Sequence, residues 1–179
     1  MQKKLLWCWK NCWTFDLKQM KKFLFPILLT AFIVFYWYRY MRAPSLDFAE
    51  VALVTENNTA FSLSDSLETP AIIHFHASWC GPCMKELPEI ASVQHTLEAM
   101  GYHLYFITDD KFETMYNIKE SFGLDGKHYR THSLRDIGVR SLPGTQIISN
   151  SGELKYKTTG ACKWKDAGFL NSLKTFVAQ

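Results

Sequence analysis

The sequence predicts an α/β fold in which helices cover both faces of a mixed central sheet, preceded by one transmembrane helix. Short β-like segments alternate with helical segments after a continuous apolar stretch, and this alternation favours a sheet with crossover helices. The length of 179 residues suits one domain with a full hydrophobic core and an additional segment. We therefore expect a single folded domain behind an N-terminal membrane segment.

The N-terminal end is basic, and the apolar stretch follows it directly. Residues 1–22 contain six lysines against the single Asp16. Residues 23–38 carry no charged side chain and would form a helix of about 24 Å, slightly shorter than a hydrocarbon core of about 30 Å. The long side chains of Lys22 and Arg39 can reach the membrane surface at either end and complete a single span.

We expect the apolar segment, Phe23 to Met41 (residues 23–41), to remain as a signal anchor. Cleavage of a signal peptide requires small residues after the apolar core, and bulky aromatic residues stand there instead. The lysine excess predicts that residues 1–22 form a basic cytoplasmic segment and that residues 42–179 lie across the membrane. In a bacterium this describes a single-pass protein of the inner membrane with a periplasmic domain, where cysteine pairs can be oxidised.

Six segments of the domain are expected to be β-strands because they are short, apolar or alternating, and bounded by turn residues. Asn57 and Asn58 tolerate positive φ and would connect the first two strands as a β-hairpin. The apolar run AIIHFHA suits a buried strand. The expected strands are 50–55, 59–64, 71–77, 102–108, 144–149 and 153–159.

Three further segments have the apolar spacing of helices. The first, residues 83–100, is expected to end before Gly101, and the second, residues 111–122, at Gly123, because glycine often follows the last turn of a helix. The third covers residues 166–177. Strands that alternate with these helices imply the mixed sheet with helices on both faces.

Charge and cysteine spacing argue against two functional classes. A formal net charge of +3 is too small to indicate a nucleic-acid partner, and no basic stripe is interleaved with aromatic residues in the domain. The spacing of the five cysteines contains no four-cysteine or Cys/His finger, so we expect no structural metal site and no cofactor. The cysteines are Cys8, Cys12, Cys80, Cys83 and Cys162.

Cys80 and Cys83 stand where an expected buried strand gives way to a helix. Free N–H groups and the helix dipole favour a thiolate there, so Cys80 is the expected nucleophile and Cys83, one turn later, can close a disulfide with it. Gly81 and Pro82 separate the two cysteines, and Pro82 fits a first helical turn because it lacks an N–H. Trp79 is expected to shield the pair. Half of a metal site and a structural disulfide in a tight turn are the alternatives.

Two motifs carry a resemblance to a known superfamily. ASWCGPCMKELPEI, residues 77–90, resembles the active-site segment of the thioredoxin fold, and its residues 85–88 are similar to the membrane-anchored TlpA/ResA-like branch. VRSLPGTQIISNSGEL, residues 139–154, resembles the loop, strand and turn around the cis-proline of that fold, which would be Pro143. The resemblance covers residues 45–177.

This resemblance implies a thioredoxin-like three-layer fold with an N-terminal β-hairpin extension. It also implies a thiol:disulfide oxidoreductase that exchanges its Cys80–Cys83 dithiol/disulfide with cysteine-containing exported proteins and receives electrons from a transmembrane thiol relay. Pro143 would lie against the cysteine pair as active-site support, together with Trp79, Gly81 and Pro82. Leu142 would contact an extended substrate and would favour a flexible polypeptide with apolar residues around its cysteine.

The direction of electron flow and a second function rest on smaller features. Gly-Pro between the cysteines resembles reducing thioredoxins, and the histidine that oxidising relatives carry there is missing, so a reductant is favoured over an oxidant. Residues 40–44 (YMRAP) and 157–166 show a weaker likeness to the anchored thioredoxin-like proteins of bacterial copper-sensitivity suppressor systems. A Cu(I)-binding module that combines both thiolates with His74 or His76 is the second hypothesis, and an inactive scaffold is disfavoured because both sulfurs are present.

His74 departs from the resemblance, because thioredoxins carry a buried acid six residues before the first cysteine and many anchored relatives an asparagine. A neutral imidazole could relay the proton that Cys83 loses before it attacks a mixed disulfide. The alternative is a core histidine satisfied by backbone or water, and for His76 a partly exposed strand position is expected. Cys162 is expected to be a half-buried apolar residue, and Cys8 and Cys12 to be inert thiols.

Overall fold

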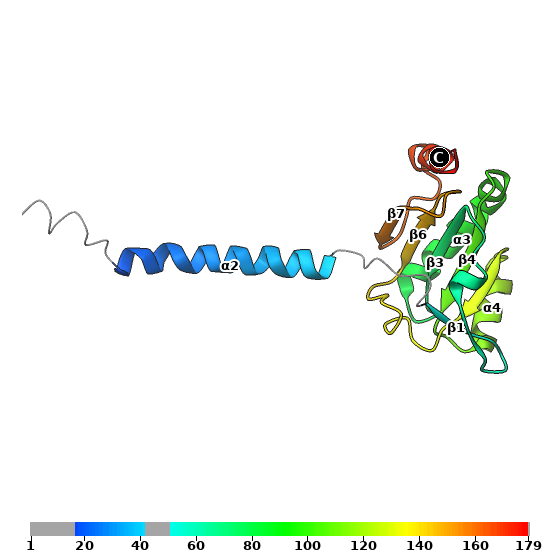
Figure 1. Ribbon diagram of the computed structural model, residues 1–179, viewed down its shortest axis with the longest axis horizontal. Coiled ribbons are helices and arrows are strands. Elements are labelled where there is room, and N and C mark those ends of the chain that lie inside the picture. The colour runs from blue at the N-terminus through cyan, green and yellow to red at the C-terminus, as the bar shows by residue number, and fades with distance from the viewer. Residues whose placement is uncertain (1–16, 42–50, 179) are drawn as a thin grey trace, which may run out of the picture. The chain divides into compact units, whose positions relative to one another are not determined.

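The computed structural model describes residues 17–41 and 51–178, with side chains for 24–38 and 51–178. The chain divides into two compact units, Met1–Arg42 and Ala43–Gln179 (Figure 1). The predicted basic segment before residue 17, with Cys8 and Cys12, and the predicted linker after residue 41 lie outside the described residues.

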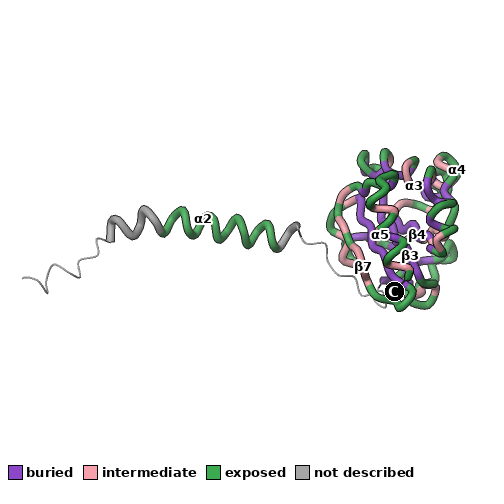
Figure 2. The backbone as a smooth tube through the Cα atoms, turned by 90° about the horizontal axis from the view of Figure 1, so that it is seen from above, coloured by how far each residue is buried: buried purple, intermediate pink, exposed green. Residues whose placement is uncertain are grey.

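The first unit contains the helix α2, Leu17–Met41, with Pro26 inside it. The large apolar side chains of residues 24–38 are exposed along its length (Figure 2). Among the residues that were searched, no helix is both long and apolar enough to cross a membrane. The anchor over residues 23–41, whose two ends fall outside the described side chains, stays a prediction.

The second unit is built on one mixed sheet of seven strands in the order β2-β1-β5-β4-β3-β6-β7. The central strand β3 pairs in parallel with β4 and antiparallel with β6, and β4 pairs in parallel with β5. The strands are β1 Ala52–Val54, β2 Ala60–Ser62, β3 Ala71–Phe75, β4 His103–Thr108, β5 Lys127–Arg130, β6 Gly144–Ile148 and β7 Leu154–Thr159.

Three α-helices of this unit pack on one face of the sheet: α3 (Gly81–Ala99), α4 (Phe112–Phe122) and α5 (Ala167–Val177). The crossovers β3-α3-β4 and β4-α4-β5 step across the sheet in the same direction, and right-handed crossovers then place both helices on the same side. The other face is covered by the single-turn helix η1 (Leu63–Asp65) and by residues 131–142. The expected helices on both faces are therefore found only in part, because the second face carries the single-turn η1 and no α-helix of the described residues. The thioredoxin-like α/β fold is confirmed.

The hydrophobic core consists of two layers separated by the sheet. Apolar side chains of β3 alternate between them, with Ile72 on the helical side and Ile73 and Phe75 on the opposite side. On the helical side, the fully or nearly fully buried side chains include Leu87, Ile90, Leu97, Leu104, Phe106, Ile147, Trp164 and Leu173. This double burial explains why β3 is continuously apolar apart from one histidine, and it fixes the strand that leads into the cysteine pair.

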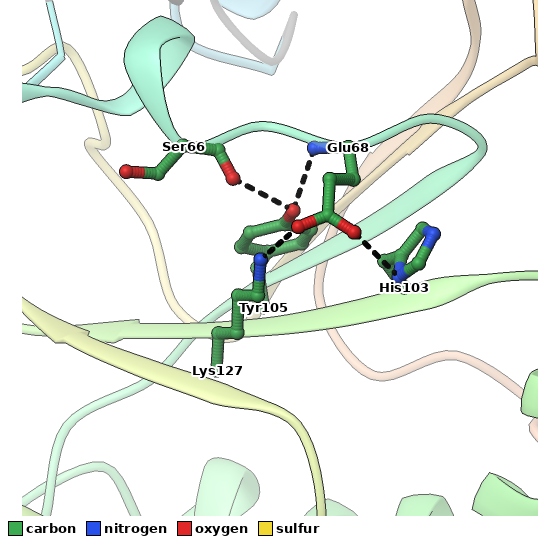
Figure 3. A network of polar contacts seen from close by, with 5 residues as sticks. All are labelled: Ser66, Glu68, His103, Tyr105 and Lys127. Atoms are coloured by element: carbon green, nitrogen blue, oxygen red, sulfur yellow. Dashed lines mark hydrogen bonds and ion pairs between the residues drawn. The ribbon is translucent and has the colours of Figure 1, made fainter.

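Polar contacts attach the segment before β3 to the sheet (Figure 3). The Tyr105 hydroxyl accepts a hydrogen bond from the Glu68 N–H (2.7 Å) and donates one to the Ser66 carbonyl (3.0 Å). The Glu68 carboxylate forms an ion pair with Lys127 and lies 3.5 Å from Nδ1 of His103. Residues from β4 and β5 thereby hold the chain on its approach to the central strand.

Most expected elements are confirmed, and one strand was missed. The hairpin β1-β2 forms with Asn58 at φ 59°, and α4 ends at Gly123 in the left-handed conformation (φ 60°). The strand β5 has no counterpart among the expected segments. Its four residues, Lys127–Arg130, are charged or aromatic and half-buried, so they show neither an apolar run nor a clear alternation.

Candidate active site

The structure joins Cys80 and Cys83 in a disulfide at the start of α3, with their Cα atoms 5.2 Å apart. Cys80 is the N-cap residue of the helix, and its sulfur accepts a hydrogen bond from the Cys83 N–H at 3.2 Å. The side chain of Cys80 is 5% exposed, while that of Cys83 is fully buried. An N-cap sulfur faces the unpaired N–H groups of the first turn, so this position favours a thiolate at Cys80 in the reduced protein.

The loop ahead of the disulfide is fixed by the Asp110 carboxylate. It accepts hydrogen bonds from the Ser78 N–H (2.7 Å) and the Ser78 hydroxyl (2.7 Å), and from the Thr108 hydroxyl (3.0 Å). Trp79 follows this anchored serine and points outward, with 73% of its surface exposed. It therefore does not shield the pair as expected, but offers an apolar surface beside it. The cysteines are instead packed against Ala77, Met84 and Leu142.

The loop before β6 carries the predicted cis-proline. The peptide bond between Leu142 and Pro143 is cis, which confirms the expected conformation. Gly144 pairs with Phe75 in the antiparallel register of β6 and β3, so the loop lies beside the end of the strand that leads into the cysteine pair. The Pro143 carbonyl accepts a hydrogen bond from the Gly160 N–H (2.7 Å), and Leu142 packs against the disulfide.

His74 lies buried in the middle of the sheet. Its Nδ1 is 3.1 Å from the Thr145 hydroxyl in β6, and its Nε2 has no hydrogen-bond partner among the described residues. Its ring stacks on that of His76, with 6.0 Å between the ring centroids. Burial lowers the pKa of His74 well below its usual value, and the neighbouring His76 lowers it further. A neutral imidazole is therefore the stable form at this site.

Two more histidines adjoin His74 on this side of the sheet, one of them buried and the other half-buried with ring nitrogens shielded from solvent. His76 is fully buried, which corrects the expectation of a partly exposed strand residue, because the layer of helices covers this face of the sheet. His128 in β5 stacks on Phe106 with 4.7 Å between ring centroids. Burial lowers the pKa of His76 to about 4, and burial together with the charge of His76 lowers that of His128 to about 4.

Glu86 is a buried polar residue of this region to which the sequence analysis gave no role. It follows Cys83 by three residues on α3, and its Oε1 accepts hydrogen bonds from the Cys162 N–H (2.8 Å) and the Trp164 indole N–H (2.6 Å). Its Oε2 has no hydrogen-bond partner among the described residues, and burial raises its pKa. The sequence did contain a signal for this burial, because Glu86 stands between Cys83 and Leu87 on the face of α3 that is otherwise apolar.

Cys162 is the free cysteine of the described region, and it is buried beside this carboxylate. Burial raises the pKa of its thiol to about 11, so the thiol is a weak nucleophile. Among the residues that were searched, no group of three or more His, Cys, Asp or Glu side chains is arranged to hold a metal ion.

Comparison with known proteins gives consistent matches. The family model described as "AhpC/TSA family" matches residues 42–157. A thioredoxin-family thiol:disulfide interchange protein from Chlorobium tepidum has a similar structure, with a TM-score of 0.58, 24% identity and coverage of 76% of this chain and 99% of that one. StoA from Bacillus subtilis gives a TM-score of 0.51 at 17% identity and covers 74% and 98% of the two chains. These structural likenesses concern the fold.

A curated protein from Arabidopsis thaliana named "Probable nucleoredoxin 1" is 29% identical over 84 residues, which is 46% of this chain. The match spans 13% of the length of that relative. The family model, in contrast, matches more than half of this chain and includes the cysteine pair, the buried histidines and most of the sheet. The chain therefore belongs to the AhpC/TSA family.

Proposed function

We propose that the protein is a thiol:disulfide oxidoreductase that exchanges the Cys80–Cys83 dithiol/disulfide with cysteine-containing substrate proteins. The observation that carries this proposal is the position of the pair, at the N-terminus of α3 and in contact with Leu142 next to a cis-proline. Disulfide exchange needs a stabilised thiolate, a second sulfur within reach and a surface for an extended chain. The family membership supports the same chemistry.

In the reducing direction, the Cys80 thiolate attacks one sulfur of a substrate disulfide. A mixed disulfide forms, and the other substrate sulfur leaves as a thiolate that takes up a proton. Cys83 then loses its proton and attacks the Cys80 sulfur, which restores the Cys80–Cys83 disulfide and releases the second substrate thiol. Two electrons pass from the protein to the substrate, and an external dithiol must return them before the next cycle.

Several side chains have proposed roles around this exchange. Trp79, Gly81 and Pro82 shape the turn that presents Cys80. The loop that contains the cis-proline Pro143 presents backbone groups to the substrate chain, with Leu142 as an apolar contact. His74 is the proposed proton relay for Cys83. Two observations support the relay: the His74 ring is neutral, and its Nε2 has no hydrogen-bond partner among the described residues. A core histidine with both ring nitrogens satisfied would have a partner at Nε2.

We further propose that the protein acts as a reductant and is anchored in a bacterial inner membrane by Phe23 to Met41, with a cytoplasmic N-terminus and a periplasmic domain. The lysine excess before the apolar stretch supports this topology. Gly-Pro between the cysteines supports the reducing direction. The substrates would then be exported proteins with cysteines, and the electron donor a transmembrane thiol relay.

The reduction potential of the Cys80–Cys83 pair in the full-length protein tests the activity and its direction together. Equilibration with dithiothreitol or glutathione buffers in detergent should give a value near that of thioredoxin, about −270 mV. A value near about −120 mV would instead identify an oxidant. Failure of the pair to exchange with either buffer would refute the oxidoreductase proposal.

A further inference from the structure

A surface pocket lies directly beside the redox pair, between the first turns of α3 and the segment that leads into α5. Pro82, which separates the two cysteines, lines one end of it. The opposite wall comes from residues 161–166, which follow β7. A polypeptide bound at Cys80 would therefore reach this pocket with side chains close in sequence to its own cysteine, because an extended chain advances about 3.3 Å per residue.

The inner wall of the pocket contains polar groups that are removed from solvent. Glu86 and Cys162 both line it, and both are buried. One carboxylate oxygen of Glu86 is held by the Cys162 N–H and by the indole of Trp164, while Oε2 lacks a hydrogen-bond partner among the described residues. An unsatisfied buried oxygen costs free energy, and an N–H or O–H group of a bound chain would satisfy it.

The outer rim of the pocket is rich in lysine. Lys85, Lys163 and Lys165 are exposed, and none of them forms an ion pair with another described residue. Two further acids, besides Glu86, line the pocket. Glu89 is half-buried, and the Asp166 carboxylate accepts a hydrogen bond from the Phe169 N–H (2.9 Å) as the N-cap of α5.

The charged side chains of the pocket differ in how far neighbouring groups already offset their charge. The charge of Asp166 is offset by the helix terminus that it caps. The three lysines and Glu89, in contrast, have no ion-pair partner within the described part of the chain, so positive charge is in excess among the uncompensated groups. The rim is therefore complementary to a negatively charged side chain, and such complementarity mainly governs selectivity and the rate of association.

We propose that this pocket is a substrate subsite that selects polypeptides with an aspartate or glutamate within a few residues of the target cysteine. The inference rests on the proposed exchange activity, and it adds a substrate class to it. The acidic side chain would enter between the three lysines while the neighbouring cysteine forms the mixed disulfide with Cys80. Since these lysines are exposed, the selectivity should weaken as salt increases.

The test compares three disulfide-containing peptides that differ at one position, two residues from the cysteine, where they carry Glu, Gln or Lys. The reduced full-length protein is mixed with each peptide in detergent, and kcat/KM for disulfide reduction is measured at low and high salt. At low salt we expect the Glu peptide to react at least fivefold faster than the Lys peptide, with the Gln peptide between them. The difference should shrink at high salt.

Replacing lysines of the rim by glutamate tests whether these residues cause the preference for the Glu peptide. Lys163→Glu combined with Lys165→Glu should reverse the order of the Glu and Lys peptides, and circular dichroism shows whether the variant is folded. Lys174→Glu is the matched control, because this exposed lysine lies on α5 and does not line the pocket. It should leave the preference intact.

The possible failures are distinguishable. Equal rates for all three peptides, or a preference that the double variant retains, would overturn the acidic subsite while the exchange activity stands. If Lys174→Glu removed the preference as effectively as the double variant, the selectivity would come from overall charge and the pocket assignment would be wrong. If none of the peptides were reduced, the proposed activity itself would fail, and the subsite with it.

Discussion

Acid should destabilise this protein through its buried histidines. His76 and His128 have pKa values of about 4 in the folded protein, and burial is the main cause. In the unfolded chain a histidine titrates near 6.5. The unfolded chain therefore binds more protons between these two values. The stabilising contribution of the neutral rings is fully present above about pH 6.5 and is lost as the pH falls toward about 4.

The size of this effect follows from linkage. A shift of about 2.5 pKa units corresponds to about 3 kcal/mol per histidine when the titration is complete, and about 2 kcal/mol of it is lost by pH 5. His76 and His128 together should remove about 4 kcal/mol between pH 7.5 and pH 5, and His74, whose pKa is also lowered by burial, adds to this loss. Domains of this size are stabilised by about 5–15 kcal/mol, so such a loss is readily measured. Glu86 acts in the opposite direction, because its raised pKa lets the folded protein retain a proton.

Denaturant unfolding of the full-length protein in a mild detergent, followed by circular dichroism, measures this dependence. His128→Phe is the informative variant, since the new ring can stack on Phe106 and carries no titratable group. The variant should lose about 2 kcal/mol of the pH dependence between pH 7.5 and pH 5, while His74, His76 and Glu86 are common to both proteins and cancel. If wild type and variant showed the same pH dependence, the assignment to buried imidazoles would be refuted.

Three further predictions concern the active site and the sheet. Cys83→Ser should accumulate a mixed disulfide between Cys80 and a substrate protein, visible on a non-reducing gel, whereas Cys80→Ser should trap none; equal trapping by both variants would contradict their assigned roles. Asp110→Ala removes two hydrogen bonds to the loop before the redox pair, so it should cost about 1–3 kcal/mol in denaturant unfolding, and an unchanged midpoint would contradict the anchoring role. Gly126→Ala should cost about 2–4 kcal/mol, because a Cβ there would lie 2.7 Å from the Leu104 carbonyl oxygen at φ +115°; a cost below about 1 kcal/mol would disprove the clash.

Local sequence features predicted the parts of the fold that local physics determines. The hairpin at Asn58, the end of α4 at Gly123 and the start of α3 at the cysteine pair each depend on a few adjacent residues. The strand β5 instead forms because β1 and β4 pair with its two edges, which is a long-range effect. Its mixture of charged and aromatic residues does not reveal that environment.

The site residues show the same difference between features that depend on adjacent residues and features that depend on distant ones. Cys80, Cys83 and the cis bond before Pro143 could be placed from two motifs. The exposure of Trp79 could not, because the loop that carries it is held at Ser78 by Asp110, 32 residues later in the chain. The burial of Glu86 was likewise hidden, since the groups that satisfy its carboxylate come from residues 162 and 164, at the far end of the domain.

His74 and Glu86, two of the buried titratable residues in the region of the redox pair, also bear on the direction of electron flow. A strongly oxidising pair needs a reduced form that is stabilised as a thiolate, and a nearby buried positive charge would provide this. Here burial lowers the pKa of His74, which opposes a positive charge, and raises that of Glu86, which opposes a negative one. The stabilisation of the Cys80 thiolate is then left mainly to the N-terminus of α3 and the Cys83 N–H.

A helix terminus alone is a modest source of stabilisation, worth about 0.3–2 kcal/mol. For a two-electron couple, 1.4 kcal/mol corresponds to about 30 mV, so this term shifts the potential by a few tens of millivolts and not by the about 150 mV that separates oxidants from thioredoxin. We therefore expect His74→Ala to change the potential by less than about 30 mV while it alters the pH dependence of mixed-disulfide resolution. A large change in potential with an unchanged pH profile would show that His74 sets the thiolate energy and relays no proton.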